Sequence, residues 1–327
     1  MNEADVRAVA AAFGVDVAGA RITPLTGGYT NESWRIDAPR TPVVVRRYGR
    51  VHLDTAGIAF EHALLAHVAP ALDAVRAPLR DEAGATFHRT PHGAVAVFPW
   101  IAGTTGARDA ATGVAAARML ARFHRAARDL HVSDGTRSTR VLGILPWLHE
   151  TFKDFAAAHA PLARALPWND LIVALGAATI RLAPRARELP IVIVHGDPNP
   201  ENVVSEGGAV RGLIDFDFAQ ETERVYDVGA LLDEFARADD DAPLDLERVA
   251  PLVDAYAREA PLSDAERATV ADAMLRHAAF LTWYVVTRHG ERSPGDIGGA
   301  PRYAQRVREI ALAGPEISER VRLPPAR

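Results

Sequence analysis

Three polar residues, Asp197, Asn202 and Asp215, have types and spacing that suit phosphate chemistry. Asp197 follows the apolar run at 191–194 and a His-Gly pair, and Asn202 comes five residues after it. Asp215 lies thirteen residues beyond Asn202, behind a second apolar stretch. Phosphoryl transfer needs one carboxylate that can accept a proton, together with oxygen ligands for magnesium such as an amide and a second carboxylate.

Short strands and a tight turn must bring these residues together. The stretch "SEGGAV" at 205–210 is short enough to join two strands into a hairpin, which predicts that Asn202 and Asp215 face each other across it. Gly196 permits unusual backbone geometry directly before Asp197. Two alternatives stay open at this point, since Asp and Asn beside prolines are common in turns and His-x-Asp also occurs in metal hydrolases.

The segments "HGDPNPEN" and "LIDFD" resemble the catalytic and metal-binding segments of the aminoglycoside phosphotransferase and homoserine/choline kinase family. That family is similar to the protein kinases, which carry H-R-D-x-x-x-x-N and D-F-G in these places. The resemblance implies that Asp197 is the catalytic base or the carboxylate that orients the hydroxyl. It further implies that Asn202 and Asp215 hold Mg²⁺ and that His195 has a structural role.

The same resemblance implies an α+β fold of the protein-kinase-like class, and the pattern along the chain agrees with it. A small β-sheet N-lobe with one helix is expected at 1–98, and a larger, mainly helical C-lobe at 99–327. We expect a helix at 3–14, two strands within 23–48, a helix at 57–69 and a strand pair within 84–103. Helices are expected further on at 111–130, 170–186, 226–237, 245–259, 264–289 and 302–313.

A cation for the nucleotide phosphates is expected on the strand "VVVRRY". Lysine occurs once in the chain, at Lys153, so an arginine must fill this role. The strand's resemblance to the family's "VLR" or "VAIK" segment implies that Arg46 takes this place and that Val44, on the same face, lines the adenine pocket. Arg47 is the competitor, and strand alternation turns its side chain to the other face. Glu61, on the helix that follows, is the expected ion-pair partner.

Two further segments are expected to contact the nucleotide. Gly27 and Gly28 in "TGGYTN" fit a loop over the phosphates, although a hairpin turn explains both glycines equally well. The segment "VFPWIAG" lies where the family's hinge runs, so Phe98 and Trp100 are candidates for the adenine site. Pro99 between them has no N–H group, so adenine there must use carbonyls and neighbouring N–H groups.

The acceptor of the phosphate is expected to be a small molecule. Gly196 stands where protein kinases have the arginine that holds a phosphorylated activation loop, and no A-P-E segment follows Asp215. Asp227 is expected to cap a helix and brace the catalytic loop. The candidate acceptor contacts are Asp233, Glu234, Trp283, Tyr284 and Arg288.

Composition narrows the functional classes. The chain has 327 residues, 48% of them hydrophobic, and a net charge of −5, which suits a globular protein of two lobes and argues against nucleic acid as a partner. The absence of cysteine excludes disulfides and a thiol nucleophile, and suits a cytoplasmic protein. No apolar run reaches the roughly 18 residues that a membrane span needs.

These observations predict an ATP- and Mg²⁺-dependent small-molecule kinase. The expected acceptor is a hydroxyl group of an aminoglycoside-like or amino-alcohol substrate. A homoserine-kinase-like metabolic enzyme is the alternative within this class. A nucleotide-binding protein without transfer activity and a metal-dependent hydrolase are the rivals from other classes.

Overall fold

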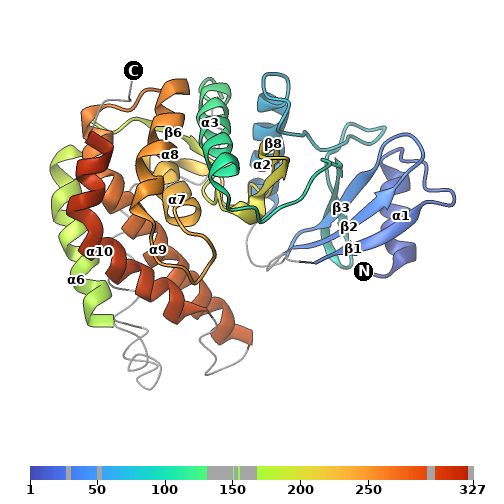
Figure 1. Cartoon of the computed structure of the whole chain (residues 1–327). Helices are drawn as coiled ribbons and strands as arrows, with labels where there is room; N and C mark the ends of the chain where they lie inside the picture. The colour runs from blue at the N-terminus through green and yellow to red at the C-terminus, as the bar shows by residue number, and fades with distance from the viewer. Residues whose placement is uncertain are drawn as a thin grey trace.

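The computed structural model describes residues 1–26, 31–49, 54–130, 150, 154, 168–292 and 299–322. Its architecture mixes α-helices and β-strands, as the sequence predicts. Figure 1 shows an N-terminal part that contains the main sheet, at the right, and a larger part at the left that consists mostly of helices.

Five antiparallel strands form the N-terminal sheet, in the order β1-β2-β3-β5-β4. They are β1 (Arg21–Leu25), β2 (Glu32–Asp37), β3 (Val43–Arg47), β4 (His88–Thr90) and β5 (Gly93–Pro99). The two strands expected within 23–48 are confirmed as β2 and β3, whereas β1, which begins before this stretch at Arg21, was not predicted. The missed strand contains Pro24, which lacks an N–H group and is tolerated because β1 lies at the sheet edge.

The two faces of this sheet differ, since successive side chains of a strand point to opposite faces. Val43 and Val45 of β3 belong to an apolar cluster that includes residues of helix α1 (Glu3–Ala12). Val44 and Arg46 therefore lie on the other face, away from α1. One face of the sheet thus packs against the apolar core that includes α1, and the other face carries the polar contacts of Arg46.

Helix α2 (Thr55–Val68) connects the two parts of the molecule. Its Ile58 packs with Tyr48 next to the sheet, whereas its Leu64 belongs to the large core of the helical part. Strand β8 (Ala209–Leu213) contributes Leu213 to the same large core. Because α2 shares apolar contacts with both parts, it fixes Glu61 between the sheet and the helical part.

The helical part contains the remaining long helices and two short antiparallel strand pairs, β6 with β9 and β7 with β8. The helices are α3 (Ala110–Ala126), α6 (Trp168–Leu182), α7 (Val225–Phe235), α8 (Leu246–Glu259), α9 (Asp264–Arg292) and α10 (Ala300–Arg322). The strands are β6 (Ile191–Val194), β7 (Val203–Glu206) and β9 (Gln220–Glu223), besides β8. Each helix expected from the sequence is thereby confirmed, with ends that differ by several residues in some cases. Within the part of the chain that the structure describes, no helix combines the length and apolarity needed to cross a membrane.

Helix α7 packs very closely against α9, and a glycine permits this approach. A Cβ atom added at Gly229 would lie 2.5 Å from the carbonyl carbon of Ala273 and 2.6 Å from the backbone nitrogen of Met274. Real Cβ atoms do not approach backbone atoms so closely, so any side chain at this position must push the two helices apart. Asp227 of α7 contacts the segment at 195–202, which the sequence predicts to be catalytic and which is called the catalytic segment below. The packing of α7 on α9 therefore helps to position this segment.

We predict that Gly229→Ala destabilises the protein by about 3 kcal/mol, because the added methyl overpacks a helix–helix contact made by backbone atoms. Gly176→Ala in α6 is the matched control, since nothing lies within 4 Å of its added Cβ. Alanine favours the helix by about 0.5–1 kcal/mol over glycine, so this control should be slightly stabilised. Urea unfolding of both variants measures the difference, and equal stability would contradict the packing argument.

Candidate active site

The catalytic segment begins where β6 ends, and its backbone geometry requires glycine. Gly196 has a φ of +87°, in the region that side chains disfavour. A Cβ atom there would lie 2.1 Å from the carbonyl oxygen of Phe218. The chain can therefore turn from the buried strand towards Asp197 only because residue 196 has no side chain.

Asp227 holds this turn in place. Its carboxylate is fully buried and accepts hydrogen bonds from the backbone N–H groups of His195, at 2.7 Å, and Gly196, at 2.9 Å. The ring Nε2 of His124 lies 2.9 Å from the same carboxylate. The expectation that Asp227 caps a helix is wrong, because α7 is preceded by Arg224 at its N-cap, without a side-chain cap. Asp227 lies inside the first turn and directs its carboxylate to the catalytic segment.

His195 connects the catalytic segment to the segment that carries Asp215. Its Nε2 lies 3.1 Å from the carbonyl oxygen of Ile214, and its Nδ1 accepts the N–H of Asp197 at 3.3 Å. This pairing makes Nε2 the protonated nitrogen. Burial lowers the pKa of His195, so the ring is neutral and serves as a spacer between the two segments.

The carboxylate of Asp197 is held by two amide side chains. Asn199 Nδ2 donates to Oδ1 at 2.9 Å, and Asn202 Nδ2 donates to Oδ2 at 3.0 Å. Burial raises the pKa of Asp197 to about 7, with His277 opposing the shift and Glu234 adding to it. A carboxylate whose pKa lies near neutrality is well suited to accept a proton from a hydroxyl group.

Asn202 and Asp215 lie at the open ends of the β7–β8 hairpin, as the sequence predicts. The N–H of Ile214, next to Asp215, donates to the carbonyl oxygen of Asn202 at 3.0 Å. The amide nitrogen of Asn202 is committed to Asp197, so its Oδ1 is the atom left for a metal. Asp215 has a φ of +63°, the one positive value among the described non-glycine residues, which is a sign of a functional constraint. Both residues offer oxygen donors, and the pair therefore fits Mg²⁺.

Arg46 enters the site from the sheet and meets three carboxylates. Its Nη1 donates to Glu61 Oε1 at 3.0 Å, and its Nη2 donates to Asp215 Oδ1 at 2.6 Å and to Asp217 Oδ1 at 2.8 Å. Arg47 lies on the opposite face, where its Nε donates to Glu32 at 3.0 Å. The structure therefore brings Arg46 and Glu61 together with the segment that carries Asp215 and places Arg47 away from it.

The expected adenine-binding residues lie next to each other on the sheet. Val44 and Phe98 are direct partners in the β3–β5 register, so their side chains share the face that carries Arg46. The backbone N–H of Trp100 donates to the carbonyl oxygen of Pro42 at 3.0 Å and is not free for adenine. Gly27 and Gly28 lie outside the described residues.

The expected acceptor contacts Asp233 and Glu234 are buried and paired with arginines. Arg306 Nη1 donates to Glu234 Oε1 at 2.8 Å, and Arg237 Nη2 donates to Asp233 Oδ1 at 3.3 Å. Burial acts to raise the pKa of Glu234, but His277 and Arg306 outweigh burial and hold this pKa below its usual range. The two acids are therefore already compensated, and their contact with an acceptor stays a prediction.

The remaining acceptor candidates lie on α9. Trp283 and Tyr284 are half-buried, and the ring of Tyr284 lies 5.5 Å from that of Phe218, next to the catalytic segment. Arg288 belongs to α9, but its side chain lies outside the described part. The structure thus brings Tyr284 near the site and leaves the role of all three residues a prediction.

Asp217, His277 and Asn199 are among the residues near the site that the sequence did not identify. Asp217, in "IDFD", lies two residues after Asp215 and shares Arg46 with it, a spacing that could have identified it. His277 lies 3.7 Å from Glu234 and acts on the pKa of Asp197. It precedes Tyr284 by seven residues and so lies on the same face of α9.

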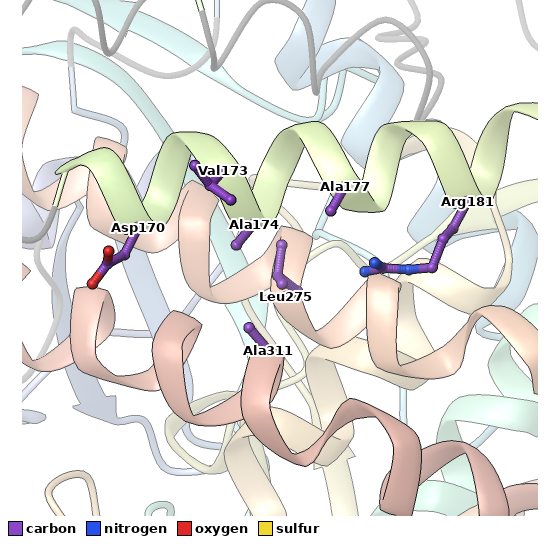
Figure 2. A pocket seen from close by; sticks show the side chains of 7 residues that line it. All are labelled: Asp170, Val173, Ala174, Ala177, Arg181, Leu275 and Ala311. Carbon is purple, nitrogen blue, oxygen red and sulfur yellow. The ribbon is translucent and has the colours of Figure 1, made fainter.

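A separate hollow of about 370 Å³ lies between α6, α9 and α10 (Figure 2). Small and apolar side chains, such as Ala174, Ala177 and Ala311, form much of its lining. None of the residues predicted for the active site lines it. Chemistry is therefore assigned to the Asp197 region and not to this hollow.

Comparison with known proteins agrees with this geometry. The model of the phosphotransferase enzyme family, APH, matches residues 21–262. The homoserine kinase of Polaromonas naphthalenivorans is 27% identical over 258 residues, which cover 79% of this chain and 78% of the relative.

Two solved structures show that the fold is kinase-like. A microcompartment-associated aminopropanol kinase superposes with a TM-score of 0.71 at 15% identity, covering 97% of this chain and 98% of the other. An aminoglycoside phosphotransferase from Alicyclobacillus acidocaldarius superposes with a TM-score of 0.67 at 16% identity, covering 97% and 96%. The protein-kinase-like fold class expected from the sequence is thereby confirmed.

We predict that Arg46→Ala weakens nucleotide binding at least about tenfold, because it removes the cation nearest the metal ligands. The same change should lower the melting temperature, since it leaves Glu61 and Asp217 buried without their partner. Arg47→Ala is the matched control and should change nucleotide binding less than about twofold, since its ion pair is exposed. Calorimetric titration with ATP measures both variants, and a larger effect of Arg47→Ala would contradict the assignment.

Proposed function

Because the chain belongs to the phosphotransferase enzyme family, we propose that it is an ATP-dependent kinase that phosphorylates a hydroxyl group of a small, amine-bearing molecule. The observation that carries this proposal is the carboxylate of Asp197, held by two amides beside the oxygen ligands of Asn202 and Asp215. The family supports ATP and a divalent metal ion as cofactors, and the oxygen-only donor set favours Mg²⁺.

The residues of the site have separable tasks in this reaction. Asp197 accepts the proton of the acceptor hydroxyl, whose oxygen then forms a bond to the γ-phosphorus of ATP. The bond from that phosphorus to the bridging oxygen breaks, and ADP leaves with the electron pair. Asn199 and Asn202 orient the carboxylate, and Arg46 binds the phosphate oxygens. Asn202 and Asp215 would hold Mg²⁺, which would neutralise negative charge on the phosphates.

The acceptor is proposed to be a small hydroxy amino acid, with homoserine as the first compound to test. The homoserine kinase of Polaromonas naphthalenivorans supports this choice, since its similarity extends over 79% of this chain. The pairing of Asp233 and Glu234 with Arg237 and Arg306 also supports it. Acids that are already compensated attract a polycationic aminoglycoside less than free acids do, so such an acceptor is the second candidate.

The geometry speaks against a metal-dependent hydrolase. Both ring nitrogens of His195 are used by protein groups, namely the carbonyl oxygen of Ile214 and the N–H of Asp197. Among the described residues, a cluster with metal-ligand spacing occurs at Asp233, Glu234 and His277. Arg306 lies within 3.8 Å of both acids there and repels a cation.

We expect the protein to convert ATP to ADP only with Mg²⁺ and a suitable alcohol, and to form a phosphate ester of that alcohol. Mass spectrometry of products from homoserine, aminopropanol, ethanolamine, choline and an aminoglycoside measures this directly, with a chelator as control. Tight ATP binding without any ester would instead support a nucleotide-binding protein without transfer activity.

We predict that Asp197→Asn lowers kcat by about a hundredfold or more, because the amide cannot take the proton. Its affinity for magnesium-ATP should stay nearly unchanged. Asp215→Asn is the comparison variant and should lose magnesium-dependent nucleotide binding as well, since it removes a metal ligand. Steady-state kinetics and calorimetry on both variants separate the two roles. Near-normal turnover by Asp197→Asn would contradict the assignment of the base.

A further inference from the structure

Asp217 is a buried carboxylate to which neither the sequence pattern nor the proposed mechanism gives a task. It is 2% exposed, and it lies in the segment between β8 and β9. Its Oδ1 accepts from Arg46 Nη2 at 2.8 Å, and its Oδ2 accepts from Asn31 Nδ2 at 2.6 Å. Both partners belong to the N-terminal sheet region, so Asp217 joins that region to the metal-binding segment.

Both polar atoms of the Asn31 side chain form hydrogen bonds. Its amide nitrogen donates to Asp217, and its Oδ1 accepts the backbone N–H of Gly49 at 3.0 Å. The amide therefore cannot rotate without losing both bonds. Asp217 is held by this rigid partner on one oxygen and binds Arg46 with the other.

Asp215 and Asp217 both accept hydrogen bonds from the same nitrogen of Arg46, Nη2. Nη2 carries two hydrogens, and one is directed to each carboxylate. The side chain of Asp215 is 36% exposed, whereas that of Asp217 is 3% exposed with both oxygens in use. Asp215 can thus turn to a metal ion, while Asp217 cannot do so without losing a partner.

We propose that Asp217 is the positioning residue for Arg46. A Mg²⁺ ion held by Asp215 would compete with Arg46 for this carboxylate and would leave one hydrogen of Nη2 available to a phosphate oxygen. The second hydrogen stays on Asp217, and Nη1 stays on Glu61, so the guanidinium keeps its orientation. This inference rests on the proposed function, since it needs a nucleotide whose phosphates reach Arg46.

The proposal can be tested by the direction in which Asp217→Asn changes the affinity for nucleotide phosphates. Removing a carboxylate near a phosphate site strengthens the binding of the phosphate by charge alone. The proposal requires the opposite result for Asp217→Asn, because an asparagine there has no charge to hold Arg46. Its amide also cannot accept from Arg46 and Asn31 on both atoms.

The experiment is a titration of the folded protein with ATP, ADP and adenosine in the presence of Mg²⁺, followed by calorimetry or by displacement of a fluorescent nucleotide. For Asp217→Asn we expect the affinity for ATP and ADP to fall about tenfold, the scale of one charge-assisted hydrogen bond. Adenosine, which has no phosphate, should bind as it does to the native protein. Asn31→Ala should change the affinities in the same direction by a smaller factor, and it decides the matter if Asp217→Asn does not fold.

Glu32→Gln is the matched control, because it breaks the ion pair between Glu32 of β2 and Arg47 of β3. This pair lies on the face of the sheet opposite to Arg46. It should leave all three affinities unchanged. Unchanged or tighter ATP binding by both site variants would overturn the inference, and so would an equal loss of adenosine binding, which indicates a structural role. If the native protein binds no nucleotide at all, the proposed function fails, and the inference fails with it.

Discussion

The buried carboxylate of Asp227 is the constraint on which the catalytic arrangement depends. It accepts the two N–H groups that the turn at His195 and Gly196 leaves without strand partners. Such groups are costly when they are buried and unpaired. Gly196 has left-handed backbone geometry, and its Cα lies against Phe218, so the turn needs contacts that define it. Because Asp227 belongs to α7, the position of Asp197 is tied through this carboxylate to the packing of α7 on α9.

A second constraint connects the sheet to this framework. Helix α2 shares its apolar residues with both parts of the molecule, and the ion cluster around Arg46 joins them at the site. The cluster sets one guanidinium against the three carboxylates of Glu61, Asp215 and Asp217. Burial, together with the charge of Asp217, raises the pKa of Glu61 against the opposing effect of Arg46. This excess of acidic groups is a setting that a divalent cation would relieve.

Sequence patterns predicted the local features of this site better than its long-range contacts. The hairpin that brings Asn202 near Asp215 and the alternation that turns Arg46 inward both follow from spacing over a few residues. The role of Asp217 could not be predicted, because its partners Arg46 and Asn31 precede it by 171 and 186 residues. The burial of Asp233 and Glu234 was missed for a related reason. Arg237 pairs with Asp233 at a local spacing of four residues, but Arg306, which contacts both acids, lies on α10, and no local pattern links that helix to α7.

The presence of arginine in place of lysine at position 46 follows from the same geometry. A lysine ammonium is a single point of charge on a flexible chain, whereas a guanidinium presents donors in a planar fork. Two separate nitrogens of Arg46 contact three carboxylates that approach from α2 and from the metal-binding segment. One nitrogen can therefore change partner while the other keeps its own. A lysine ammonium offers its hydrogens from one atom, so a turn towards a phosphate moves all of its contacts together. In the proposed reaction, the fork would thus allow Arg46 to stay anchored to the protein while it binds a phosphate oxygen of the nucleotide.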